Sequence, residues 1–160
     1  MASSPWMREW NDIIRYVIFP DEELRSLMML PENTTIITFR DKYFLRATTL
    51  TEPLTNETVR ILYGNYGTSL AGAPHVLDQR ISFEIYVQRK QQHNMDDTPG
   101  ADRLLSRTEL IAERLKELLT AKNDSRLGGY HFRCIGESDM STNTIGYDRY
   151  NVTFQYMKTT

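Results

Sequence analysis

The chain has 160 residues, of which 40% are hydrophobic and 25% charged, proportions typical of one globular domain. Its 19 Lys and Arg and 21 Asp and Glu residues give a net charge of −2, which disfavours binding of nucleic acid through a general positive field. The single cysteine, Cys134, cannot form an internal disulfide, and no run approaches the roughly 20 apolar residues of a membrane span. The start also lacks the apolar stretch of a signal peptide, so we expect a soluble protein made inside the cell.

The first 31 residues predict two helices. Apolar side chains recur every three or four positions from Trp6 to Ile18, which places them on one helical stripe. After a break at 19–21, acidic residues begin a second, short helix that ends before Pro31. We expect one domain over 1–160, with a helical segment at 1–31 and a sheet with its packing helix at 32–160.

Several later segments have the composition or alternation of β-strands. The runs TTIITF (34–39) and YFLRATT (43–49) are rich in β-branched and aromatic residues, and the short polar break between them predicts a hairpin. The clearest strand is RISFEIYVQ (80–88), in which apolar and polar residues alternate. Two closing strands are predicted at YHFRCIG (130–136) and RYNVTFQYM (149–157).

One helix and several loops separate these strands. Leucines and small residues form an apolar stripe from about Asp102 to Ala121, which predicts a long amphipathic helix packed against the sheet. Glycines and a proline predict a long loop over 64–78. Polar loops are expected at 89–101 and 137–148, the first being longer than compact domains usually contain without a purpose. The fold class is therefore α+β: a mainly antiparallel sheet, one long amphipathic helix packed across it and two N-terminal helices.

Few residues suggest chemistry. His131 and Cys134 are close in sequence, but an odd separation along a strand places them on opposite faces, so a buried structural cysteine is favoured over a nucleophile with its base. The glycine-rich stretch 64–72 lacks the Lys-Ser/Thr ending of a phosphate-binding loop. Asp96 and Asp97 are compatible with a cation site, although adjacent acids before Thr-Pro-Gly are more often a solvated turn. We expect no enzyme, cofactor or metal site.

The C-terminal half, from Arg80 to Lys158, resembles the tail terminator and tail-to-head joining (neck) proteins of long-tailed bacteriophages. The resemblance rests on four features: the strand RISFEIYVQ, the polar loop through DDTPGADRL, the helix SRTELIAERLKELL and the closing strands that end in GYDRYNVTFQYM. That family implies a small α/β fold that forms a ring, usually of six subunits, on the last ring of the tail tube. The two N-terminal helices and the segment 50–78 exceed a minimal terminator.

The resemblance implies a structural virion protein, assembled in the host cytoplasm and located in the neck or tail. Its expected partners are copies of itself, the tail tube protein and the head connector. DNA would pass through the ring without specific binding, which a net charge of −2 permits. Contacts are expected from the loops at 91–101 and 138–148. The candidate interface residues are His93, Met95, Asp96, Asp97, Met140, Asn143, Tyr147 and Asp148.

Two alternatives remain open from the sequence. The chain fits another connector subunit of the neck or collar, because the N-terminal region differs from the terminator pattern. It also fits a small non-enzymatic adaptor that binds a protein partner through the sheet. The mass in solution separates the adaptor from the ring, since an adaptor remains small in isolation while a ring-former reaches a higher mass.

Overall fold

The computed structural model describes residues 5–46, 58–70, 73–94, 105–122, 124–140 and 146–158, with the backbone alone at 5–6, 66–70 and 73–78. The fold is α+β, with a five-stranded sheet whose strand order is β1-β2-β3-β5-β4. All neighbouring strands are antiparallel except β1 and β2, which are parallel. The strands are β1 (Phe44–Arg46), β2 (Val59–Leu70), β3 (Ala73–Gln88), β4 (Tyr130–Met140) and β5 (Tyr147–Lys158).

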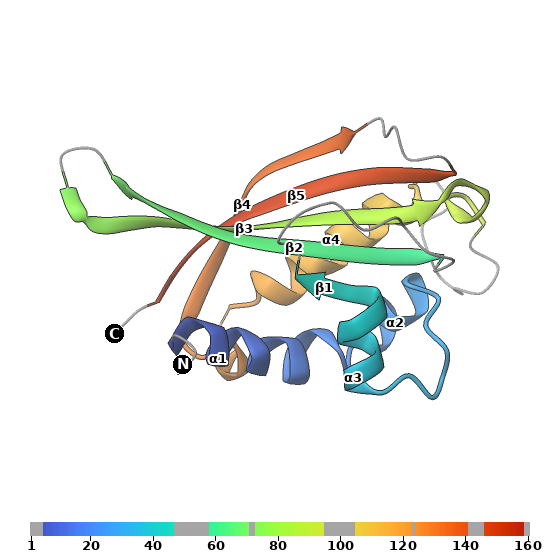
Figure 1. Ribbon diagram of the computed structural model, residues 1–160, viewed down its shortest axis with the longest axis horizontal. Coiled ribbons are helices and arrows are strands. Elements are labelled where there is room, and N and C mark those ends of the chain that lie inside the picture. Colours follow the sequence, from blue (N-terminus) through green and yellow to red (C-terminus); the bar gives the residue numbers. More distant parts are fainter. Residues whose placement is uncertain are drawn as a thin grey trace.

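The helices lie together on one side of the sheet, in what we call the helical layer (Figure 1). Helix α1 (Pro5–Ile13) continues as a π-helical turn, η1 (Ile14–Ile18), and is followed by α2 (Glu22–Leu27). A third helical segment consists of α3 (Ile36–Thr38) and a second π-helical turn, η2 (Phe39–Tyr43). The longest helix, α4 (Arg107–Leu119), packs on β3 and β5, and short 3-10 turns η3 (Arg89–Gln91) and η4 (Ser125–Leu127) flank it in sequence.

A single hydrophobic core joins the N-terminal helices to the sheet. The indole of Trp10 is fully buried, and its ring centroid lies 5.6 Å from that of Tyr63, 6.0 Å from that of Phe83 and 6.4 Å from that of Phe132. These partners belong to β2, β3 and β4, so one aromatic side chain of α1 spans three strands. Contacts of this kind stabilise a core beyond the apolar area that they bury.

The predicted hairpin at 34–49 is wrong in its first half. Thr35 lies in an extended conformation and its hydroxyl accepts a hydrogen bond from the Thr38 amide at 3.2 Å, which caps a helical turn. Phe39, in the turn that follows, is fully buried in the core. The cap and the burial of Phe39 outweigh the β-propensity of Ile36 and Ile37. Of the described residues of the second run, Phe44–Arg46 form a strand, which pairs with β2 in parallel instead of with 34–39. Residues 47–49 of this prediction lie outside the described residues.

The predicted loops at 64–78 and 137–148 are shorter than expected. Strands β2 and β3 remain paired from Val59 to Leu70, and they extend beyond the rest of the sheet as an arm (Figure 1). Likewise β4 continues to Met140 and β5 begins at Tyr147. The ladder bonds use backbone groups, so glycines and polar side chains extend a strand once its neighbour is fixed.

The helix predicted over 102–121 has its described limits at Arg107 and Leu119, which makes it 13 residues long. Its start is set by Ser106, whose hydroxyl accepts a hydrogen bond from the Glu109 amide at 3.4 Å, while the Glu109 carboxylate reaches back to the Ser106 amide. This reciprocal capping fixes the residue at which the helix begins. The predicted pair of N-terminal helices is not clearly matched. The structure has α1 running into the π-helical turn η1, then the six-residue α2, and a third segment, α3 with η2, that was not predicted.

The strand register places one row of residues straight across the whole sheet. Following the paired positions from edge to edge, this row consists of Phe44, Ile61, Ile85, Tyr150 and Asp139. Strand β1 and the last residues of β4 therefore lie at the same level along the strands, on opposite edges of the sheet.

Candidate functional site: an acidic groove at the β4 edge

An open groove of about 600 Å³ lies where β3 and β4 end and where β5 and α4 begin. Four elements that are distant in sequence contribute to it, and most of its lining side chains are polar. We call this feature the acidic groove. It is lined by Arg89, Gln92, His93, Ser106, Glu109, Asp139, Met140 and Asp148.

The segment after β3 is fixed to the start of α4 by a set of hydrogen bonds around Gln92. The Gln92 side chain donates to the Thr108 hydroxyl at 2.8 Å and accepts from the Thr108 amide at 3.0 Å. The Gln92 carbonyl also accepts from the Arg107 amide at 2.8 Å. Gln92 is buried, so its amide would be costly to leave unpaired, and these bonds hold the neighbouring His93 at the groove.

Arg107 is fully buried and connects three segments through backbone carbonyls. Its Nη1 donates to the carbonyl of Leu27 at 2.8 Å and its Nε to that of Gln91 at 3.1 Å, while Nη2 donates to the carbonyl of Asn94. The guanidinium thus ties the end of α2 and the segment 91–94 to the first turn of α4. A planar group with five donors suits this role, which a lysine would fill only in part.

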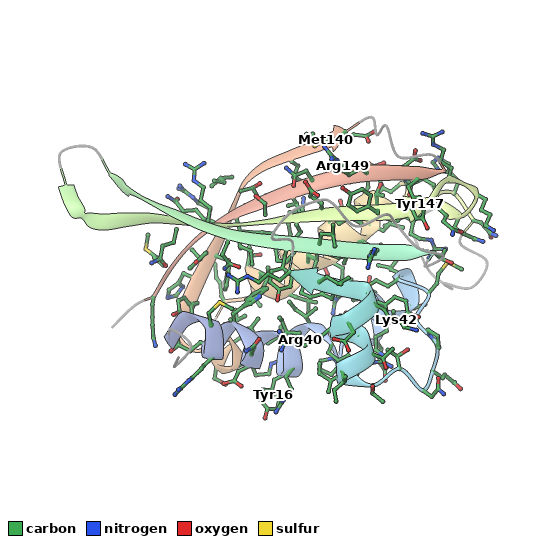
Figure 2. The ribbon with its side chains drawn as sticks, in the orientation of Figure 1. Tyr16, Arg40, Lys42, Met140, Tyr147 and Arg149 are labelled. Carbon is green, nitrogen blue, oxygen red and sulfur yellow. The ribbon has the colours of Figure 1, made fainter. Side chains whose placement is uncertain are left out.

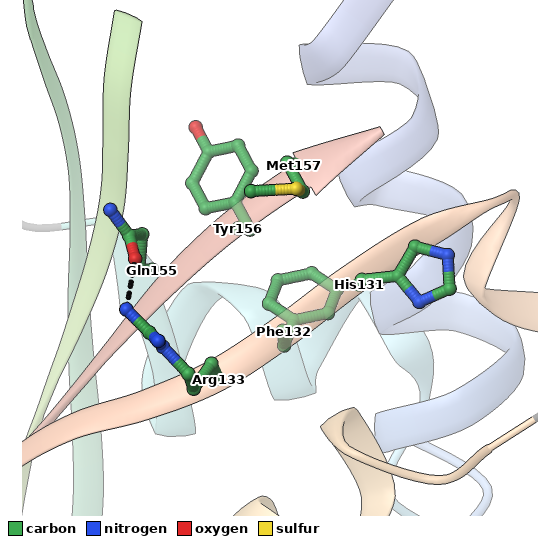
Figure 3. Close-up of a pocket in the computed structure, with 6 residues that line it drawn as sticks. All are labelled: His131, Phe132, Arg133, Gln155, Tyr156 and Met157. Carbon is green, nitrogen blue, oxygen red and sulfur yellow. Dashed lines mark hydrogen bonds between the residues drawn. The ribbon is translucent and has the colours of Figure 1, made fainter. Parts of the chain in front are cut away.

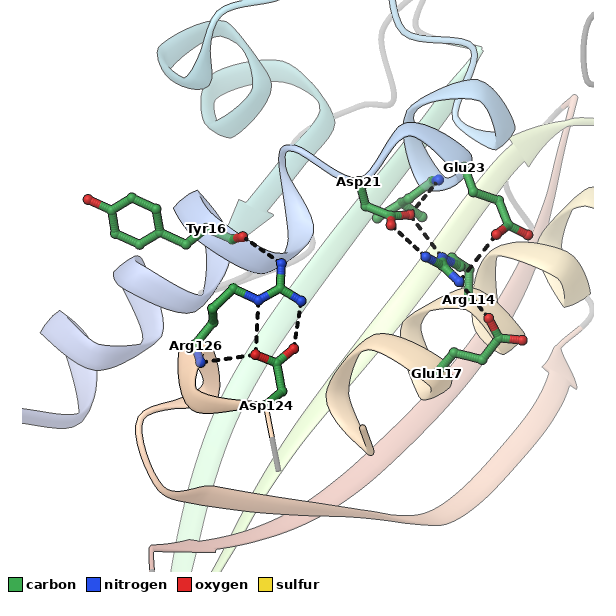
Figure 4. Close-up of polar contacts among 8 residues, drawn as sticks. Tyr16, Asp21, Glu23, Arg114, Glu117, Asp124 and Arg126 are labelled. Atoms are coloured by element: carbon green, nitrogen blue, oxygen red, sulfur yellow. Dashed lines mark hydrogen bonds and ion pairs between the residues drawn. The ribbon is translucent and has the colours of Figure 1, made fainter. Parts of the chain in front are cut away.

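The position of α4 is fixed at its middle by a second arginine (Figure 4). Arg114 forms a two-pronged contact with Asp21, at 2.9 Å from Nε and 2.6 Å from Nη2, and Asp21 also accepts from the Leu24 amide as the N-cap of α2. Burial opposes ionisation of Asp21, but the bonds from Arg114 and Leu24 outweigh it, so the pKa of Asp21 lies below its ordinary value. One carboxylate therefore caps α2 and joins it to α4.

The groove carries a surplus of negative charge. Among the lining side chains, the three carboxylates of Glu109, Asp139 and Asp148 outnumber the one guanidinium of Arg89, which gives −3 + 1 = −2 when histidine is counted as uncharged. Arg149 adds a cation beside the groove, since its guanidinium donates to the Met140 sulfur at 3.1 Å. Arg89 and Asp148 are 3.1 Å apart and both partly exposed, so this ion pair contributes little to stability.

The acidic surroundings also affect Tyr150, which belongs to the transverse row that ends at Asp139. Burial, followed by the nearby Glu137 carboxylate and then those of Glu109 and Asp139, raises the pKa of Tyr150 to about 12. Its hydroxyl donates to Glu137 at 3.2 Å. The Tyr150 phenol therefore lies near three carboxylates, those of Glu109, Glu137 and Asp139.

Of the residues predicted for the interface, three line the acidic groove: His93, Met140 and Asp148. Tyr147 is buried next to it, and its hydroxyl accepts from the Gln88 side chain at 3.4 Å (Figure 2 shows Tyr147 and Met140). The others, Met95, Asp96, Asp97 and Asn143, lie outside the described residues. The two predicted contact loops thus converge in space, although more than 40 residues separate His93 from Met140 in the sequence.

Sequence reasoning did not identify Arg89, Glu109 or Asp139 as part of the site. Asp139 lies in the expected contact loop at 138–148 but was not one of the candidate residues, and Glu109 falls within the helix predicted from about Asp102 to Ala121. The signal that could have identified Glu109 is the S-x-x-E spacing from Ser106, which places this carboxylate at the start of α4. Arg89 comes directly after the strand predicted at 80–88, so the sequence could also have predicted its position at a strand end.

A smaller pocket of about 250 Å³ lies at the other end of β4 and β5 (Figure 3). It is bounded by the bond from Arg133 to the Gln155 side chain, 2.8 Å long, and by Met157, which is 61% exposed. His131 lines this pocket, while Cys134 is half-buried on the opposite face of β4, as the sequence predicted. Because the two side chains lie on opposite faces, the geometry does not pair the thiol with the imidazole, and burial raises the pKa of the Cys134 thiol.

The described part of the chain shows no group of three or more His, Cys, Asp or Glu side chains that could hold a metal ion. Among the described residues, the longest helix is also too short and too polar to cross a bilayer.

The fold and the groove define a class: an α+β protein built on a mainly antiparallel five-stranded sheet, with an acidic groove at one edge. The sequence model of the YomW family matches residues 11–156, which is most of the chain, and the protein therefore belongs to that family. The family name is of the type given to proteins of the Bacillus phage SPBc2, which indicates a phage-related protein. No curated protein matches the sequence.

Proposed function

We propose that this chain is a structural virion protein of a phage neck or tail end, which forms a ring that caps the tail tube and joins it to the head connector. The observation that carries the proposal is the convergence of the two expected contact loops on one groove. His93 comes from the first and Met140 and Asp148 from the second, and all three line the same open surface. The phage-related family name supports the same reading.

The architecture of the groove suits a contact surface. Its walls are held from beneath by Arg107 and Gln92, so its shape is preorganised before any partner arrives, which lowers the entropy lost on binding. Its lining is polar and accessible, as expected of a subunit that is stable alone before it assembles. The arm of β2 and β3 provides a second projecting element that reaches beyond the sheet (Figure 1).

The first test is the mass of the purified chain, measured by light scattering coupled to size-exclusion chromatography over a range of concentrations. A mass near six subunits, alone or after addition of purified tail tubes, supports the ring. In the second case, electron microscopy should show a cap at one end of each tube. A chain that stays monomeric and leaves the tubes uncapped contradicts the proposal and favours the adaptor.

A pair of matched variants assigns the contact to the groove. His93 and His131 are both exposed histidines, and they line different pockets, which lie at opposite ends of β4 and β5. We expect His93→Trp to impair assembly or capping because the bulky ring obstructs the groove, whereas His131→Trp should leave both unchanged. Equal behaviour of the two variants would remove the groove from the proposal.

A further inference from the structure

Opposite the acidic groove, the other edge of the sheet carries a basic patch formed by η2 and β1. We define the basic patch as Arg40 and Arg46, which line one open pocket together with Ile37 and Asp41. Arg46 is exposed and Arg40 is half-buried. Ile37 is 70% exposed, the largest exposure of any large apolar side chain in the described part of the chain. Figure 2 shows Arg40 on the turn below β1.

The patch and the groove lie at the same level on opposite edges. Phe44 of β1 and Asp139 of β4 end the same transverse row, so four strand spacings separate them. At about 4.8 Å per spacing, the two edges are roughly 19 Å apart. Both features also belong to the helical layer, because η2 buries Phe39 in the core and α4 supplies Glu109 to the groove.

The two surfaces are complementary in charge. The patch has two cations, and Asp41 in the same lining reduces its charge to +2 − 1 = +1, while the side chains that line the groove carry −2. Each also has one accessible apolar side chain, Ile37 on the patch and Met140 in the groove. A contact of groove with groove, or of patch with patch, would place like charges together, which is unfavourable. The favourable contact between two copies is therefore patch to groove.

We propose that the basic patch of one copy of this chain docks on the acidic groove of the next copy. This inference rests on the proposed function and specifies its subunit contact. A patch that meets a different patch on its neighbour forms a heterologous interface, and repetition of such a contact gives a closed ring when the rotation returns to the first subunit. Because both surfaces are at one level of the sheet, successive sheets would stand side by side around the ring.

Charge reversal tests the contact, with assembly measured by light scattering in low salt. We expect Arg40→Glu alone and Asp139→Arg alone each to raise the concentration needed for half-assembly by about tenfold or more. The matched controls Lys122→Glu and Glu113→Arg change charge by the same amounts at exposed positions outside both surfaces, and they should assemble like the wild type.

Mixing the two weakened variants gives the decisive measurement. In a mixture, Glu introduced at 40 meets Arg introduced at 139, and the native Arg40 meets the native Asp139, so alternating copies restore every contact. We expect the 1:1 mixture to recover the wild-type mass, and we expect high salt to weaken the wild-type assembly. Circular dichroism of each variant should match that of the wild type, since both positions are on the surface.

Each outcome decides between the contact and the ring. A wild type that assembles while both reversals assemble equally well overturns the patch-to-groove contact but leaves the ring intact. A wild type that forms only a dimer, weakened by both reversals and rescued on mixing, keeps the contact and overturns the ring. A reversal at 40 that abolishes DNA binding but not assembly assigns the basic patch to nucleic acid and overturns the contact. A chain that stays monomeric even with tail tubes overturns both.

Discussion

The burial of Arg107 leads to a quantitative prediction about stability. Replacing Arg107 with Met keeps a long apolar side chain in the space but removes every guanidinium donor. The carbonyls of Leu27, Gln91 and Asn94 then lose their hydrogen-bond partner. Since Arg107 has no exposed surface, water cannot replace the guanidinium without a rearrangement of the surrounding segments.

The expected loss follows from the three bonds. A hydrogen bond from a charged donor contributes about 1.5 kcal/mol or more to net stability, and a buried acceptor left unpaired costs about 1–3 kcal/mol. Met recovers part of this loss, because it needs no desolvation of a charge. We therefore expect Arg107→Met to lower the free energy of unfolding by about 3–5 kcal/mol. Arg107→Lys, which retains the charge and fewer donors, should lose less.

The assay is urea unfolding followed by circular dichroism, with Arg126→Met as the matched control. Arg126 is exposed and pairs with Asp124 at 2.6 Å, so its loss should cost less than about 1 kcal/mol. Limited proteolysis should also show faster cleavage of Arg107→Met next to 91–94, the segment that supplies His93 to the groove. If Arg107→Met is within about 1 kcal/mol of the wild type, the three carbonyl bonds do not stabilise the fold as argued.

Three further predictions concern charged and capping residues. Asp21→Asn should lower the free energy of unfolding by about 1–3 kcal/mol at neutral pH. Because the pKa of Asp21 is depressed in the folded protein, the difference between variant and wild type should be full at pH values above the ordinary pKa of an aspartate and should disappear as the pH falls through the depressed pKa. Urea titrations at several pH values would measure this. Absorbance at 295 nm should show a phenol that titrates near pH 12 in the wild type and is missing in Tyr150→Phe. Because the pKa of Tyr150 is raised in the folded protein, the stability that this residue contributes should be lost as the pH rises from 10 to 12. Ser106→Ala should cost about 1 kcal/mol in urea, with Ser125→Ala, at an exposed position, as the control.

The sequence predicted the sheet best where apolar and polar residues alternate. In β3 the side chains of Ile81, Phe83, Ile85 and Val87 are all fully buried, on the face where the alternation placed them. Such a pattern needs no knowledge of the neighbours, because the period of two alone fixes which face is apolar. The part of β2 and β3 that forms the arm has no such alternation. Its glycines and proline favour turns, so the sequence did not predict strands there.

The sequence predicted the groove only in part, for a different reason. His93, Met140 and Asp148 were chosen as loop residues, and no local pattern shows that two loops meet. Their convergence follows from the topology, in which β5 inserts between β3 and β4 and brings the end of one loop beside the start of the other. Glu109 joins them because its cap fixes the first turn of α4 there.

The construction of β4 explains why a neighbour would contact this edge through side chains. As an edge strand, β4 has backbone groups on one side that no other strand of the sheet uses, and such edges invite pairing with another chain. Its register shifts between Cys134 and Gly136, however, which leaves Ile135 as a bulge that is 37% exposed. Beyond the bulge, the exposed charges of Glu137 and Asp139 further disfavour a pairing strand. The edge thus resists unspecific sheet extension, while the groove beside it remains open to a side-chain contact of defined charge, as the patch-to-groove interface requires.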